Sequence, residues 1–144
     1  MERLIETLLE LEAEATRFIR TLVPQKGRAT LVTLRGELGV GKTAFTQAAA
    51  RALGVAEIVT SPTFVLEKIY LLSGQQFKRL IHIDAYRLEK GSELAPLGFD
   101  ELMHDEGNLI LLEWPEKVEG ALPTPTMKVS FTVNSDGSRI LSYA

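Results

Sequence analysis

The segment Gly36-Glu37-Leu38-Gly39-Val40-Gly41-Lys42-Thr43 has the residue types and the spacing of a phosphate-binding loop. Its glycines let the backbone turn tightly and aim N–H groups at a phosphate. The Lys42 ammonium can reach the β- and γ-phosphates of a nucleoside triphosphate, and the Thr43 hydroxyl can ligate Mg²⁺. An apolar run precedes the loop and a helical pattern follows it, which is the setting that this chemistry requires. The sequence therefore predicts a nucleotide-binding site.

Hydrolysis of a bound nucleotide also needs an acid at the end of a strand, where it can hold Mg²⁺ or its water and position the nucleophile. Glu113 directly follows the apolar run Leu109–Leu112, and Asp84 directly follows Leu80–Ile83. Ligands bind at the carboxyl edge of open α/β sheets, so both acids are candidates. The alternative is that each acid merely ends a strand at the surface. The sequence does not decide which acid lies nearer to the metal.

Three further features have both a functional and a structural interpretation. Trp114, the only tryptophan, either packs beside the nucleotide, belongs to a partner surface or caps the core. Ser61-Pro62-Thr63 is either a loop whose hydroxyls reach a γ-phosphate or Mg²⁺, or an ordinary turn. His82 lies between Ile81 and Ile83, a pattern that favours a hydrogen-bonded structural residue.

The elements around these residues indicate an α/β fold with a mixed sheet. A helix is predicted over Thr43–Leu53, and short helical pieces over Tyr86–Leu102. Strands are predicted at Ala29–Leu34, Phe64–Leu72, Phe77–Ile83, Asn108–Leu112, Lys128–Val133 and Arg139–Ser142. Short turns join the second strand to the third and the fifth to the sixth, so two hairpins are expected. The unbroken apolar run that ends at Leu112 predicts a central strand covered on both faces.

The first 23 residues allow two interpretations. Leu4, Leu8, Leu11, Ala15, Phe18 and Leu22 recur at helical spacing, which favours one continuous amphipathic helix. Alternatively, Arg3–Leu9 is a short strand and a helix runs from about Glu12 to Val23. Pro24 and Gly27 end the segment in either case.

Size and composition limit the function classes. The chain has 144 residues, and residues 1–144 are expected to form a single domain. There is no cysteine, which excludes disulfides and thiolate metal sites. A net charge of −3 argues against a protein that grips nucleic acid alone through a basic face. No apolar run approaches the roughly 20 residues that span a membrane. A cytoplasmic setting without membrane partners fits these features.

Several motifs together resemble one family. The phosphate loop is followed by Ser61-Pro62-Thr63-Phe64, His82-Ile83-Asp84-Ala85-Tyr86-Arg87-Leu88, Leu97-Gly98-Phe99 and Leu112-Glu113-Trp114-Pro115. In this order and at this spacing, over about residues 12–140, they resemble the bacterial TsaE family. These are small ATPases required for making threonylcarbamoyladenosine on tRNA. The resemblance implies a small P-loop NTPase-type sandwich with a largely parallel central sheet and flanking helices, and it favours the strand-then-helix interpretation of the N-terminus.

The resemblance also implies roles for the candidate residues. ATP and Mg²⁺ are expected at Leu38–Thr43, with Thr43 and Glu113 on the metal side. Asp84 is expected to be needed for hydrolysis, by organising a Mg²⁺-bound water or the attacking water. Ser61–Thr63 looks like a switch-type loop, with Thr63 near the nucleotide, and Trp114 is expected beside the active site.

The family associates with the TsaB–TsaD heterodimer, whose TsaD subunit transfers the threonylcarbamoyl group to an adenosine of tRNA. This chain is therefore expected to act as an energy-coupling subunit that meets tRNA only through the complex. Its isolated ATPase activity is expected to be weak and stimulated by partners. The rival enzyme class is a small-molecule kinase, but Glu89–Leu102 lacks the arginines of a kinase lid. A module that uses bound ATP only to shape an interaction surface is a further alternative.

Overall fold

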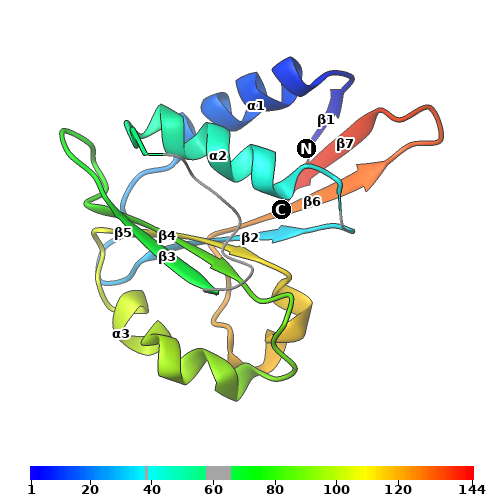
Figure 1. Ribbon diagram of the computed structural model, residues 1–144. Helices are drawn as coiled ribbons and strands as arrows, with labels where there is room; N and C mark the ends of the chain where they lie inside the picture. Colours follow the sequence, from blue (N-terminus) through cyan, green and yellow to red (C-terminus); the bar gives the residue numbers. More distant parts are fainter. Residues whose placement is uncertain (38, 58–65) are drawn as a thin grey trace.

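The computed structural model describes residues 1–37, 39–57 and 66–144, and a mixed sheet forms its centre (Figure 1). The sheet has seven strands in the order β1-β7-β6-β2-β5-β4-β3. The strands are β1 (Glu2–Ile5), β2 (Thr30–Arg35), β3 (Glu67–Leu71), β4 (Arg79–Asp84), β5 (Asn108–Glu113), β6 (Met127–Val133) and β7 (Arg139–Tyr143). The four neighbours β4, β5, β2 and β6 run parallel, whereas β3, β7 and β1 pair antiparallel. The predicted mixed, largely parallel sheet is confirmed.

Helices cover the sheet on both faces (Figure 1). The helices α1 (Leu8–Thr21) and α2 (Lys42–Ala52) lie on one face, and α3 (Phe99–Met103) lies on the other with the 3₁₀ turns η1 (Gly91–Leu97), η2 (Pro115–Lys117) and η3 (Glu119–Ala121). Side chains alternate along each strand, so β2 sends Leu34 into the core under α1 and α2 and Leu31 into the opposite core. The predicted sandwich and the short helical pieces after Tyr86 are confirmed.

The strand β5 is the central strand that its apolar sequence predicts. It lies between β2 and β4, and all six of its residues are buried. Both predicted hairpins are also present, β3 with β4 and β6 with β7. The predicted strand Phe64–Leu72 corresponds to β3, which covers Glu67–Leu71, so the described residues Leu66 and Leu72 fall outside it. Phe64 and Val65 lie outside the described residues.

At the N-terminus the continuous helix that periodicity favours is wrong, and the strand-then-helix alternative is right in kind. The strand β1 ends at Ile5, and α1 begins at Leu8 instead of Glu12. The Thr7 hydroxyl accepts a hydrogen bond of 3.1 Å from the Glu10 N–H, which caps the helix. Pairing with β7 holds β1 extended and leaves Leu4 59% exposed, so this leucine does not belong to the apolar stripe of the helix.

Glu14 of α1 links the helix to β1 and β7, the two neighbouring strands at one edge of the sheet. Arg17 holds its carboxylate through two hydrogen bonds of 2.9 and 2.7 Å, the Tyr143 hydroxyl donates to it, and Arg3 lies 3.9 Å away. Burial raises the pKa of this carboxyl, but the hydrogen bonds and positive charges outweigh burial and hold the pKa below its usual range. The ionised form therefore stabilises the folded state.

Stability that depends on Glu14 should be lost in acid. Because the pKa is lower in the folded than in the unfolded chain, the contribution is complete above the unfolded value of about 4.3 and disappears as the pH falls through the folded value. We expect Glu14→Gln to destabilise the protein by roughly 1.5–3 kcal/mol at neutral pH, and by less as the pH falls. Urea unfolding across this range measures the difference. The exposed Glu101→Gln variant of α3 is the control, and a pH-independent deficit for Glu14→Gln would contradict the prediction.

Candidate functional site

The predicted phosphate loop joins the end of β2 to the start of α2, as its sequence context requires. Strand β2 ends at Arg35, and α2 begins at Lys42. Gly41 has the left-handed φ of 106° that favours glycine, and a Cβ there would lie 2.9 Å from a methyl carbon of Leu11. The backbone therefore turns sharply just before the positive end of the helix. Leu38, which we predicted to contact the nucleotide, lies outside the described residues.

Gly36 lets the start of the loop pass close to β6. A Cβ at this position would lie 2.8 Å from Cγ2 of Val40 and 3.0 Å from Cβ of Phe131. We expect Gly36→Ala to destabilise the protein by about 1–3 kcal/mol and to weaken nucleotide binding, because the loop must shift to make room. Thermal unfolding and nucleotide titration measure these effects. Gly120→Ala is the matched control, since nothing lies within 4 Å of its added Cβ, and equal melting of both variants would refute the prediction.

Lys42 is buried inside the loop, with an exposed fraction of 4%. Its ammonium donates a hydrogen bond to the Gly36 carbonyl oxygen and lies 3.6 Å from the centre of the Trp114 ring. Burial lowers the pKa of this ammonium, while the negative charges of Glu113, Glu116 and Asp84 act in the opposite direction. The cation thus lies in a poorly solvated position where an anionic ligand would interact with it strongly.

The two candidate acids lie side by side at the carboxyl edge of the sheet. The parallel register of β4 and β5 pairs Asp84 with Glu113, and the register of β2 and β5 pairs Leu34 with Glu113. Both acids are buried, with exposed fractions of 5% and 2%, so the interpretation of each as a surface acid is wrong. One oxygen of Asp84 accepts a hydrogen bond of 3.0 Å from the Tyr86 N–H. Since β2 leads into the phosphate loop, both carboxylates lie at the loop's end of the sheet.

Sequence reasoning missed the partner of Glu113. The Nε2 atom of His82 lies 2.5 Å from a carboxylate oxygen of Glu113, and both side chains are buried. The predicted hydrogen bond of His82 is thus confirmed, but its partner is one of the candidate catalytic residues. The sequence contained part of the signal. His82 is two residues before Asp84, so both side chains point to the same face of β4, and Asp84 is paired with Glu113.

Trp114 lies beside the phosphate loop. It has a left-handed backbone with φ of 61°, unusual for a bulky residue, and its N–H donates a 3.2 Å hydrogen bond to the Leu34 carbonyl. Its half-buried ring packs 5.0 Å from the ring of Tyr86 and contacts the Lys42 ammonium. The bend after Glu113 therefore turns the ring toward the loop, although the ring also packs against the core on the α3 side.

The remaining candidates divide by position. Thr43 lies in the first turn of α2, next to Lys42, and Gly39 and Val40 lie in the loop. Thr63, with the whole predicted switch-type loop Ser61–Thr63, falls outside the described residues. The roles of Thr63 and Leu38 therefore stay predictions.

The donor set fits a magnesium–nucleotide complex. Hydroxyl and carboxylate oxygens are ligands that Mg²⁺ prefers, and Mg²⁺ usually binds through one or two carboxylates together with substrate phosphates. Thr43 supplies a hydroxyl at the start of α2, and Asp84 and Glu113 supply adjacent carboxylates. In the described part of the chain no three His, Asp or Glu side chains gather as a metal centre of their own, so the phosphates would complete the ligand set.

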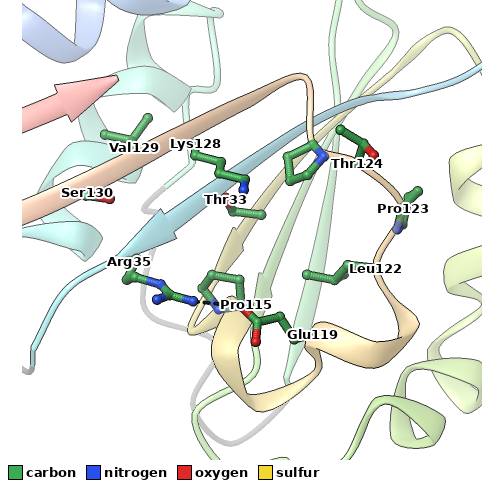
Figure 2. Close-up of a pocket in the computed structure, with 11 residues that line it drawn as sticks. Thr33, Arg35, Pro115, Glu119, Leu122, Pro123, Thr124, Lys128, Val129 and Ser130 are labelled. Atoms are coloured by element: carbon green, nitrogen blue, oxygen red, sulfur yellow. Dashed lines mark hydrogen bonds and ion pairs between the residues drawn. The ribbon is translucent and has the colours of Figure 1, made fainter. Parts of the chain in front are cut away.

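Two hollows lined by described residues lie near this region. One, of about 330 Å³, is lined by Gly36, Val40, Trp114 and residues of β6, and it adjoins the phosphate loop. The other, of about 420 Å³, lies between β2, β6 and the segment 115–125, where Lys128 and the ion pair of Arg35 with Glu119 line it (Figure 2). Lys42, Asp84 and Glu113 line neither hollow, but the first is lined by Gly36 and Val40 of the phosphate loop and by Trp114, so it is the better candidate for part of a nucleotide site.

Comparisons with known proteins agree on one family. The family model described as "Threonylcarbamoyl adenosine biosynthesis protein TsaE" matches residues 9–141. The chain is 38% identical to the tRNA threonylcarbamoyladenosine biosynthesis protein TsaE of Bacillus subtilis over 113 residues, which are 78% of this chain and 68% of that protein. It is 34% identical to the protein of that name from Rickettsia bellii, over 94% of this chain and 91% of the relative.

The fold is also similar to that of a solved structure. The crystal structure of Bacillus subtilis YdiB superposes with a TM-score of 0.78 at 28% sequence identity, and the match covers 99% of this chain and 83% of that one.

Within the described residues, every helix is too short or too polar to cross a lipid bilayer.

Proposed function

Because this chain belongs to the TsaE family and so has a role in tRNA threonylcarbamoyladenosine biosynthesis, we propose that it is the ATP-hydrolysing subunit of that pathway. One observation carries the proposal: the buried Lys42 ammonium lies in a phosphate loop beside two adjacent carboxylates, Asp84 and Glu113. This is the set of groups that ATP hydrolysis requires. The reaction yields ADP and phosphate.

Different residues of the chain have different proposed roles in the reaction. Loop N–H groups between Gly36 and Thr43 and the start of α2 bind the phosphates, and Lys42 exchanges its contact with the Gly36 carbonyl for phosphate oxygens. Mg²⁺, when bound, neutralises charge that develops on the phosphates. Thr43 and Glu113 are the proposed groups on the metal side. Asp84 orients the water that attacks the γ-phosphate.

The proposed partner is the TsaB–TsaD heterodimer. The net charge of −3 gives no reason to expect tight binding of tRNA by this chain alone, so contact with tRNA would come through the complex in the cytoplasm. We propose that ATP binding favours association and that hydrolysis resets the complex. We also propose that the isolated chain hydrolyses ATP weakly and that its partners stimulate this activity.

Reconstitution of tRNA modification tests the proposal. Multiple turnovers of the TsaB–TsaD complex are measured without this chain, with it and with its Lys42→Ala variant. We expect sustained product only with the unmodified chain. Equal product in all three reactions would refute the proposed role. An isolated chain that hydrolyses ATP as fast as it does with both partners would refute the stimulation by partners.

A further inference from the structure

The imidazole of His82 is the buried polar group whose position the proposed function does not explain. It lies on β4 with no exposed surface, and its only hydrogen bond among the described residues is the 2.5 Å contact with Glu113. Its other nitrogen, Nδ1, is buried without a partner in that part of the chain. Burying an imidazole without hydrogen bonds is costly, so the hydrogen bond with Glu113 must offset much of the free-energy cost of burying His82.

The unpartnered nitrogen indicates which atom carries the proton. A buried donor without an acceptor is rarer in proteins than a buried acceptor without a donor. We therefore assign the proton to Nε2, which donates to the Glu113 carboxylate, and leave Nδ1 as a bare lone pair. A hydrogen bond to an ionised carboxylate is about twice as strong as one between neutral groups.

The register shows what this hydrogen bond holds in place. Asp84 and Glu113 are paired across β4 and β5, and two carboxylates so placed repel each other. His82 is paired with Leu111, so its ring reaches forward along β5 to the Glu113 side chain. The ring thus holds one oxygen of Glu113 and limits the directions in which the other oxygen can point.

We propose that His82 is a positioning residue, which orients the Glu113 carboxylate for its role in the magnesium–nucleotide site. This inference rests on the proposed ATPase function. When a residue that orients a metal ligand through a hydrogen bond is removed, metal affinity or activity typically falls by about 10–100-fold.

Two substitutions separate positioning from support of the fold. His82→Leu fills the space without a donor, and we expect it to lower the kcat of partner-stimulated ATP hydrolysis about 10–100-fold. His82→Gln retains a donor at a similar reach and should keep kcat within about fivefold of wild type, because its amide can still hold Glu113. Affinity for ATP without Mg²⁺ should stay within about twofold in both, since the contacts of the phosphate loop are unchanged. His104→Leu, at the exposed second histidine, is the matched control.

A double-mutant cycle with Glu113→Gln gives the decisive comparison. If His82 acts through Glu113, His82→Leu should change kcat by less than about twofold in the Glu113→Gln background. A readout independent of turnover is the strengthening of ADP binding by Mg²⁺, followed by Trp114 fluorescence. His82→Leu and Glu113→Gln should reduce this strengthening alike, and His82→Gln should restore it.

The outcomes distinguish this inference from the proposed function. Wild type that neither binds nor hydrolyses ATP would overturn the proposed function itself. Wild type that hydrolyses ATP while His82→Leu matches it, or additive losses in the cycle, would overturn the role of His82 alone. If His82→Leu fails to fold, the cycle is run with His82→Gln, and a loss in that folded variant as large as that of Glu113→Gln would contradict the inference.

Discussion

Lys42→Ala is expected to lower kcat/KM for ATP by about 10²–10³-fold or more, because it removes the only buried cation found beside the two site carboxylates in the described part of the chain. The ammonium is already poorly solvated, because Lys42 is only 4% exposed. Its interaction with phosphate oxygens is therefore not weakened by competition with water. Partner-stimulated ATP turnover and direct nucleotide titration measure the loss.

The same substitution should leave the fold intact. Burial of the Lys42 charge is costly, and its hydrogen bond to Gly36 and its contact with Trp114 offset that cost only in part. We expect the melting temperature to change by only a few degrees, equivalent to about 1 kcal/mol. Lys128→Ala, at an exposed lysine near the second hollow, is the control. Lys42→Ala that unfolds, or that hydrolyses ATP within about threefold of wild type, would contradict the proposed binding site.

Glu113→Gln and Asp84→Asn should each lower kcat by about 10²–10⁴-fold, and they should differ in their dependence on magnesium. Because Glu113 is proposed to help bind Mg²⁺, the Glu113→Gln variant should need a higher Mg²⁺ concentration for half-maximal activity. Asp84 is proposed to orient water, so Asp84→Asn should lose kcat with a smaller change in that requirement. Both replacements preserve shape, and the amide oxygen that Glu113→Gln introduces can still accept the hydrogen bond of His82.

Magnesium titrations of ATP turnover distinguish the two acids. Glu119→Gln, at an exposed carboxylate that pairs with Arg35, is the control and should behave like the wild type. A reversed pattern would exchange the two roles. Full support of tRNA modification by Glu113→Gln would mean that hydrolysis is dispensable, and the chain would then be a module that ATP binding alone switches.

Local patterns were sufficient to predict most of the fold. The phosphate loop lies between a strand and a helix because its glycines and the apolar run before it are contiguous in the sequence. The position of β5 followed from an apolar run with no polar interruption, which only a strand covered on both faces can use. Asp84 and Glu113 were correctly expected at strand ends, and parallel strands bring such ends together.

Features that depend on distant contacts were harder to predict. The pairing of β1 with β7 overrides a helical apolar spacing that continues through Leu4, and no local pattern encodes that pairing. The contact of His82 with Glu113 depends on the exact register of two strands far apart in sequence. The left-handed turn at Trp114, which brings its ring to Lys42, has no signature in the residue types.

The pairing of β1 with β7 has a consequence for synthesis on the ribosome. Glu2 and Ser142 are neighbours in the sheet but lie 140 residues apart in the chain. At a synthesis rate of about 5–20 residues per second, roughly 7–30 s would pass between the synthesis of β1 and that of its partner β7. Phe131, which packs against the start of the phosphate loop, also emerges late. The nascent chain therefore contains the phosphate-loop sequence long before it can complete the wall behind that loop, so the proposed ATP site would form only late in synthesis.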